Sequence, residues 1–194
     1  MGPEHASLHH LGTLDDERDF REIIQRDLIS QFFYLRFMFS DSFRQIRKAQ
    51  QMMIVLFRRL IEAQQAQMLD FLNGISPSVL QGNDHKARHY LQLAYRLTGH
   101  ARIEYTMADH YRENLYSMRL YKYVRALKNI KEAGRYGVLA LIQPVLEREE
   151  KLQEIVLNYD QIRKKISLLK RDDQEKLYMM HADAYYKVLD DKSC

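Results

Sequence analysis

The sequence predicts an all-α fold, and three observations support this. Its 194 residues include only seven Gly and three Pro, the residues on which β-hairpins and sandwiches depend. The good helix formers Leu, Arg, Lys, Gln, Glu, Met and Ala are abundant. Apolar side chains recur every three or four residues over long stretches, which is the period of a helix with one apolar face. We therefore expect an elongated antiparallel bundle of three long, kinked helical arms, in one domain over residues 15–194.

The first arm is expected over about residues 15–73. Residues 1–14 show no periodicity and contain three His, two Gly and one Pro, so we expect a disordered lead there. Asp15, Asp16 and Glu17 place negative charge where the arm begins. The triplet Ser40-Asp41-Ser42 predicts a kink, and Asn73-Gly74 with Ser76-Pro77 predicts the end of the arm. Its apolar seam is expected at Phe20, Ile24, Leu28, Phe32, Leu35 and Phe39, and continues from Ile46 to Phe71.

The second and third arms are expected over about residues 85–133 and 144–190. Asn83 or Asp84 would cap the second arm after a loop over residues 74–84, and Gly134 with Gly137 would end it. Pro144 is tolerated in a first helical turn, so the third arm would start near it. Its seam would include Leu152, Ile155, Tyr159, Ile162, Ile166 and Leu169. Three thin arms expose more seam than one chain can bury, so we expect a dimer with a coiled-coil-like core.

The partner of this bundle is predicted to be a second copy or another helical protein. Residues 32–39 are apolar on almost every side, and such a segment is usually buried, most simply in an oligomer interface. Insertion into a membrane interface is the alternative. Small and large residues alternate along the seam of the second arm, which suits close helix pairing. The predicted interface residues are Phe32, Leu35, Phe39, Leu97, Ala101, Ala108, Tyr111 and Leu115.

Motifs for catalysis or for metal binding are weak or absent. His85 and His89 have the i, i+4 spacing of metal ligands, and His100 with Glu104 repeats it, but neither pair comes with further ligands. No Glu-x-x-His pair, no Gly-x-Ser-x-Gly elbow and no phosphate-binding glycine loop occurs. The lone Cys194 excludes a disulfide framework. We expect a protein that is not an enzyme, has no cofactor or metal, and works in the cytoplasm.

Basic residues cluster in the middle of the chain. Residues 75–136 hold 11 Lys or Arg against 5 Asp or Glu, which favours a polyanionic partner, although a solvated helix flank is the alternative. No apolar run is long enough to span a membrane, so contact with anionic lipid headgroups would be peripheral. Nucleic acid is less favoured, because no recognition module is present. The predicted lipid-binding residues are Arg119, Lys122, Arg125, Lys128, Lys131, Arg135, Arg163, Lys164, Lys165, Lys170 and Arg171.

The second arm resembles the BAR-domain superfamily, in particular its sorting-nexin-like and ciliary members. The resemblance covers about 50 residues. It is carried by His100 to Tyr116, by Tyr121-Lys-Tyr-Val-Arg-Ala-Leu-Lys-Asn-Ile-Lys-Glu, and by Glu147-Arg-Glu-Glu-Lys-Leu-Gln. It implies a crescent-shaped homodimer that binds and bends anionic membranes through Lys and Arg. The function expected from the sequence is thus a membrane-binding scaffold in trafficking, and the alternative is a helical adaptor subunit without membrane contact.

Overall fold

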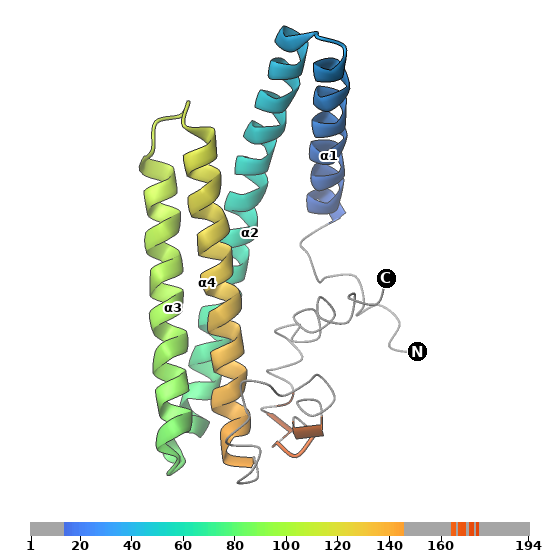
Figure 1. Ribbon diagram of the computed structural model, residues 1–194. Helices are drawn as coiled ribbons and strands as arrows, with labels where there is room; N and C mark the ends of the chain where they lie inside the picture. Colours follow the sequence, from blue (N-terminus) through green and yellow to red (C-terminus); the bar gives the residue numbers. More distant parts are fainter. Residues whose placement is uncertain (1–13, 146–163, 166, 170, 173, 175–194) are drawn as a thin grey trace. The chain divides into compact units, whose positions relative to one another are not determined.

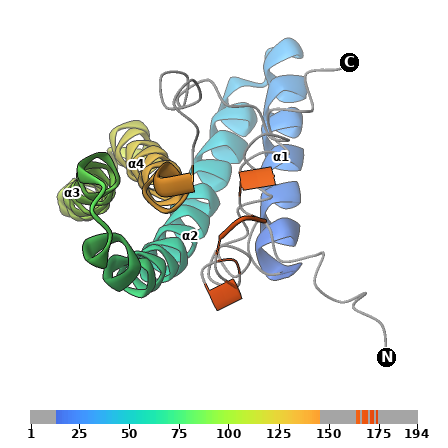
Figure 2. The same ribbon diagram turned by 90° about the horizontal axis from the view of Figure 1, so that it is seen from below.

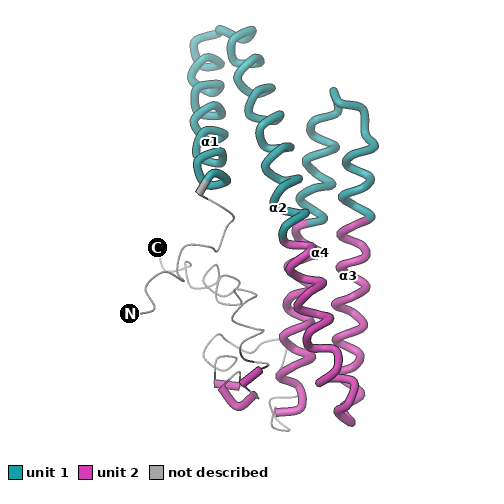
Figure 3. The backbone as a smooth tube through the Cα atoms, turned by 180° about the vertical axis from the view of Figure 1, so that it is seen from behind, with its two compact units in different colours: residues 1–63, 103–126 teal, residues 64–102, 127–194 magenta. Residues whose placement is uncertain are grey.

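The computed structural model describes residues 14–145, 164–165, 167–169, 171–172 and 174 (Figure 1). This part of the chain is all-α, as predicted, and contains no strand. Its four α-helices are α1 (Leu14–Leu35), α2 (Phe39–Gln81), α3 (His85–His110) and α4 (Tyr116–Ile142). A short 3₁₀ helix, η1 (Gln143–Val145), follows. The chain divides into two compact units, shown in Figure 3: unit 1 is residues 1–63 and 103–126, and unit 2 is residues 64–102 and 127–194.

Unit 1 contains a helical hairpin in which α1 and the first part of α2 run antiparallel, as Figure 1 shows. Its small apolar core is formed by Ile23, Ala49 and Leu56, with Met52, Met53 and Leu60 packed against it. Polar contacts also join the two helices. The side chain of Arg59 on α2 lies 2.9 Å from Asp16 and 2.5 Å from Asp19 on α1. The hairpin therefore depends on few buried apolar groups and on ion pairs at its open end.

A network of charged side chains joins α3 and α4 within unit 1. Glu104 on α3 is buried, and the amine of Lys122 and the guanidinium of Arg125 lie 2.8 and 3.1 Å from its carboxylate. A buried carboxylate without a cation would be strongly destabilising. The three side chains therefore fix the pairing of the two helices.

A second group of polar side chains in unit 1 surrounds Asp109 of α3. The phenol of the fully buried Tyr123 donates a hydrogen bond of 2.5 Å to this carboxylate. Arg58 of α2 lies 3.5 Å from the same oxygen. Burial, together with the bond to Asp109, raises the pKa of Tyr123 to about 12. Tyr105 of α3, which donates to Glu62, also has a raised pKa, mainly because of burial.

Unit 2 has an apolar core between the last part of α2, the first part of α3 and the last part of α4. In Figure 2, α3 and α4 are seen nearly end-on, and α2 runs obliquely beside them. Leu72, Ile75, Ala94 and Ile142 are fully buried. A Cβ atom on Gly137 would lie 2.6 Å from the ring of Phe71. Gly137 therefore lets α4 approach α2 closely.

The first predicted arm is two helices, because the chain reverses at residues 36–38. We expected a kink at Ser40-Asp41-Ser42, but these residues lie inside α2. Ser42 instead pins the two helices together. The hydroxyl of Ser30 on α1 lies 3.0 Å from the hydroxyl of Ser42 and 3.1 Å from its carbonyl oxygen. Both serines are buried, and their small size allows close approach.

The predicted end of the first arm at Asn73-Gly74 is wrong, since α2 continues to Gln81 with Pro77 inside it. Proline removes one helical hydrogen bond, yet the buried Leu72, Ile75 and Val79 hold this turn against the core of unit 2. Polar contacts near the proline contribute as well. Ser76 donates to the carbonyl oxygen of Leu72. Tertiary packing thus outweighs the local breaking signal.

The predicted boundaries of the second arm are partly wrong. Its cap is confirmed, because the Asp84 carboxylate accepts the backbone N–H groups of Lys86 and Ala87 at 2.9 and 3.1 Å. However, the arm breaks at residues 111–115, where no side chain is buried, and the reversal brings Lys122 to Glu104. The helix α4 then runs through Gly134 and Gly137. Neither glycine is a break, and Gly137 allows close helix packing.

Most of the third predicted arm, residues 144–190, lies outside the described residues, and so does nearly all of the predicted lead at 1–14. The assignment of residues 15–194 to a single domain stays a prediction.

Candidate functional site

The turn between α1 and α2 is a Schellman motif with an aromatic residue in the position that glycine usually occupies. The backbone N–H of Met38 donates to the carbonyl of Phe33 at 2.9 Å, and that of Phe37 donates to the carbonyl of Tyr34 at 3.0 Å. These are the two bonds that define the motif. Phe37 has a φ of 61°, in the left-handed region that side chains with a Cβ disfavour by about 1 to 2 kcal/mol.

The residue with the strained backbone at this turn has a side chain that is largely exposed to solvent. Phe37 is 80% exposed, so neither its conformation nor its burial stabilises the fold. Strained backbone of this kind clusters at functional sites, and an observed outlier is grounds for a functional hypothesis. A residue that costs stability and buries nothing indicates a contact with something outside the chain.

Phe37 stands in a group of exposed apolar side chains, which we name the aromatic tip: Tyr34, Phe37, Met38, Phe39 and Phe43. The ring of Phe39 lies 5.5 Å from that of Tyr34 and 6.1 Å from that of Phe37, centroid to centroid, in edge-to-face arrangements. With roughly 200 Å² for an exposed aromatic side chain, the tip presents on the order of 600 Å². Apolar patches of this size on a monomer usually mark a binding surface.

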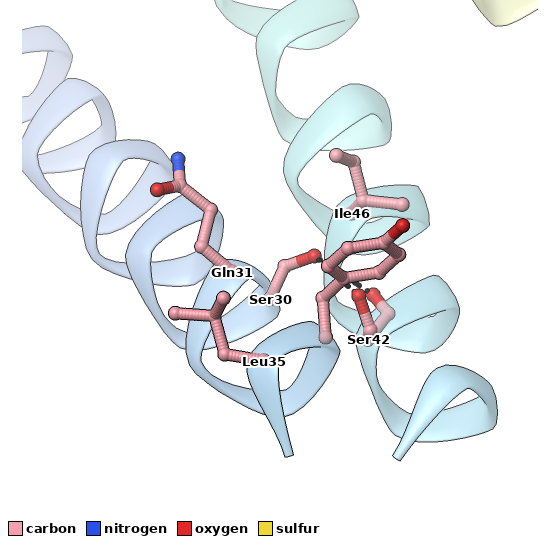
Figure 4. A pocket seen from close by; sticks show the side chains of 6 residues that line it. Ser30, Gln31, Leu35, Ser42 and Ile46 are labelled. Atoms are coloured by element: carbon pink, nitrogen blue, oxygen red, sulfur yellow. Dashed lines mark hydrogen bonds between the residues drawn. The ribbon is translucent and has the colours of Figure 1, made fainter. Parts of the chain in front are cut away.

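A groove lies beside the tip, between the end of α1 and the start of α2. Figure 4 shows Gln31 and Leu35 projecting from α1 and Ile46 from α2, with Ser30 and Ser42 between the helices. Its volume is about 440 Å³, and Ser30, Gln31, Tyr34, Leu35, Ser42 and Ile46 line it. The two hydroxyls bond to each other, so the remaining lining is mainly apolar. The groove can accept an apolar side chain.

Arginines surround the tip. The guanidinium of Arg36 lies 4.2 Å from the centre of the Phe32 ring, and that of Arg47 lies 4.8 Å from the Phe43 ring. Arg44 is exposed and pairs only loosely with Asp41, at 3.6 Å. Cations stacked on aromatic faces remain close to the apolar surface that they surround. The tip is therefore apolar at its centre and positively charged at its margin.

The predicted interface residues fall into two groups. Phe32, Leu35 and Phe39 are at least half exposed, so the first hairpin leaves them uncovered. Leu115 is also exposed, and Leu97 and Tyr111 are half-buried. By contrast, Ala101 and Ala108 are completely buried, and they pack inside the chain. The assignment of the exposed residues to an interface between chains stays a prediction.

The predicted lipid-binding residues are not equivalent in the structure. Lys122 and Arg125 pair with Glu104, and Arg119 lies 3.9 Å from Asp109 and donates to the carbonyl of Ala108. These cations have a structural partner within unit 1. Lys128, Lys131 and Lys164 are exposed, Arg135 is half-buried, Lys165 is buried and Arg171 is exposed, whereas Arg163 and Lys170 lie outside the described residues.

No group of three or more His, Cys, Asp or Glu in the described residues is placed to hold a metal ion. His85 and His89 lie in the first turns of α3. None of the helices α1 to α4 has the length and apolar character needed to cross a membrane.

The fold and the tip define an all-α protein that presents an exposed apolar surface with a cationic margin. A family model described as "Surface protein adhesin OmpL37" matches residues 5–194. The chain therefore belongs to this family of surface adhesins. No curated protein matches the chain. No solved structure matches it either.

Membership of this family corrects several predictions. The resemblance to the BAR-domain superfamily is wrong, because the adhesin family accounts for residues 5–194. Long amphipathic helices with spaced lysines occur in many unrelated proteins, so a likeness over about 50 residues was not specific. The predicted trafficking scaffold, its adaptor alternative and the cytoplasmic location are wrong for the same reason, since the family consists of surface adhesins.

The sequence predicts only part of the aromatic tip. Residues 32–39 are predicted to be an apolar segment that is most simply buried in an oligomer interface, and Phe39 is a predicted interface residue, whereas Tyr34, Phe37, Met38 and Phe43 are not. No local signal marks the turn, because the three-four spacing of Phe32, Leu35 and Phe39 continues across it and no Gly or Pro lies at the reversal. The left-handed conformation of Phe37 has no signature in the sequence.

Proposed function

We propose that this protein is a non-catalytic surface adhesin whose aromatic tip makes the adhesive contact with a protein partner. One observation carries the proposal. Phe37 adopts a strained backbone conformation and leaves 80% of its surface in solvent. Apart from its edge-to-face contact with Phe39, its side chain faces solvent, and a ligand outside the chain gives it a role. The adhesin family of the chain supports the same conclusion.

The chemistry of the tip indicates the kind of partner. Buried aromatic anchors and arginines supply most of the binding energy in protein interfaces, and both kinds of residue meet here. Arg36 and Arg44 at the margin favour carboxylates on the partner. The groove lined by Leu35 and Ile46 would take one apolar side chain. The partner is therefore a protein surface with an apolar centre and an acidic margin.

Bead adherence tests the proposal. Beads coated with the full chain would be applied to a layer of cultured cells, before and after protease treatment of that layer. We expect Phe37→Ser combined with Phe39→Ser to reduce adherence at least tenfold, because aromatic anchors at interface centres each contribute about 2 kcal/mol or more. The matched control, Val55→Ser combined with Leu69→Ser, removes two other exposed apolar side chains and should adhere like the wild type.

Each outcome of this experiment bears on one part of the proposal. Wild-type beads that adhere no better than uncoated beads would contradict the adhesive function. Adherence that survives the tip substitutions would contradict the assignment of the tip. Adherence that survives protease treatment, or equal binding to protein-free lipid vesicles, would contradict a protein partner.

A further inference from the structure

A second apolar surface lies along α1. It shares no residue with the aromatic tip, and one of its residues, Leu35, also lines the groove beside the tip. We name it the α1 stripe: Phe20, Ile24, Leu28, Phe32 and Leu35. The first four follow each other at intervals of four residues, so they stand one above the other on one side of the helix. Each of the five is about half exposed or more, and Leu35 is 76% exposed.

Another side of α1 packs within the chain. Asp16, Ile23 and Ser30 are buried, and their spacing of seven places them on one side of the helix. On the helical wheel the centre of this side lies about 120° from the centre of the α1 stripe, at 100° per residue. The α1 stripe is therefore an apolar surface that the described residues leave about half exposed or more.

We propose that the α1 stripe is the contact between two copies of this chain, with the two α1 helices antiparallel. The size of the surface fits this occupant. At roughly 200 Å² for each large apolar residue, the five side chains expose on the order of 500 Å², so two copies would bury about 1,000 Å² from these residues alone. That is the lower bound of a specific interface, and flanking polar residues add to it.

The charges of the hairpin select a second copy and its direction. Residues 15–22 contain five acidic and two basic residues, and Arg59 pairs with two of the acidic ones, which leaves this end a net charge of −2. Residues 36–48 contain four basic residues and one acidic residue, a net charge of +3. In an antiparallel pair centred near Leu28, the acidic start of each α1 lies beside the basic end of the other hairpin. A parallel pair would place like charges together, which costs free energy at an interface. The surface is thus complementary to itself when related by a two-fold axis.

Oligomeric state is the first test, measured on the full chain by sedimentation equilibrium. We expect a concentration-dependent dimer for the wild type. Leu28→Glu should raise the dimer Kd at least about 100-fold, because two carboxylates would meet at the symmetry axis, and such a contact costs several kcal/mol. The control Val55→Glu introduces the same charge at an exposed residue of α2 and should leave the Kd unchanged. Circular dichroism would confirm that both variants remain helical.

Cysteine crosslinking tests the direction, in a Cys194→Ser background that removes the only native thiol. A disulfide needs Cα atoms within about 7 Å. Leu28→Cys should therefore crosslink with itself. Phe20→Cys should not, because two Phe20 residues would lie about 24 Å apart along antiparallel helices at 1.5 Å per residue. Phe20→Cys should crosslink when it is mixed with Leu35→Cys.

A wild type that stays monomeric up to about 100 µM, a range that covers weak specific dimers, would overturn the inference. A dimer whose Kd responds equally to Leu28→Glu and Val55→Glu would also overturn it. Self-crosslinking of Phe20→Cys would contradict the antiparallel direction, because it requires parallel helices. Failure of the dimer leaves the adhesive tip untouched, because the bead assay depends on Phe37 and Phe39 and not on the α1 stripe.

Discussion

Unit 1 and unit 2 contain the same element type but distribute their apolar side chains in opposite ways. Among the described residues, unit 2 holds 17 of the 25 buried apolar residues, whereas unit 1 holds 18 of the 21 large apolar residues that are exposed. Unit 1 relies on the ion pairs around Glu104 and Asp109 where unit 2 relies on apolar packing. The difference indicates that unit 2 is organised for stability, while unit 1 presents surfaces for other molecules.

The largest effect is expected in the core of unit 2. Leu72 is fully buried, so Leu72→Ala should lower the free energy of unfolding by about 2 to 5 kcal/mol, the usual result of a cavity in a packed core. Urea denaturation followed by circular dichroism measures this. Leu35→Ala, in the exposed part of unit 1, should change it by less than about 0.5 kcal/mol. Equal losses of unfolding free energy in the two variants would contradict the difference between the units.

An intermediate effect is expected from pH, through Tyr123 in unit 1. Burial and the bond to Asp109 raise the pKa of Tyr123 from 10.0 to about 12. The folded state therefore holds the phenolic proton more tightly than the unfolded state does. The stability this provides is fully present below pH 10 and is lost as pH rises through 12, by about 1.4 kcal/mol per pH unit between these values.

Comparison with Tyr123→Phe isolates this contribution. Between pH 10 and 12 the wild type should lose stability faster than Tyr123→Phe, measured by urea denaturation at a series of pH values. Tyr121→Phe removes an exposed phenol from the same helix and should follow the wild type. Parallel curves for the wild type and Tyr123→Phe would show that the bond between Tyr123 and Asp109 does not hold the proton.

The smallest effect on the free energy of unfolding is expected at the aromatic tip, where we expect a gain of stability and not a loss. Phe37→Gly should stabilise the chain by about 1 kcal/mol, because glycine adopts the left-handed conformation without strain, although it also gives the unfolded chain more freedom. The same variant should lose adherence in the bead assay. A gain of stability together with a loss of adherence would support the conclusion that Phe37 in unit 1 serves binding and not folding. A loss of stability would mean that Phe37 supports the fold.

Local signals in the sequence predicted local structure well. The all-α class follows from helix propensity and apolar period, and the cap at Asp84 follows from one side chain and its neighbouring N–H groups. Breaks that depend on tertiary contacts were not predictable. Pro77 and Gly137 are helix-breaking residue types, yet both lie inside helices. Buried Ile75 and Val79 flank Pro77, and Gly137 packs against Phe71 and Leu72.

The candidate site was harder to predict than the fold. Periodicity shows that one side of α1 is apolar, but it does not show whether the chain covers that side. Phe20, Ile24 and Leu28 are predicted on an apolar seam, and only the structure shows that the hairpin leaves all three exposed. Basic residues were equally ambiguous, since composition alone cannot distinguish Lys122, which pairs with Glu104, from the exposed Lys128. Distant contacts decide both cases.

The pair of buried hydroxyls at Ser30 and Ser42 has a consequence for the thermodynamics of binding. Together with the Schellman bonds of Phe37 and Met38, it holds the end of the hairpin in one arrangement before any ligand arrives. The conformational entropy of the tip is then lost during folding and not during association, so more of the contact energy remains as affinity. Ser42→Ala should for this reason weaken the bound complex mainly through a larger entropic penalty, because the buried Ser42 hydroxyl bonds to that of Ser30.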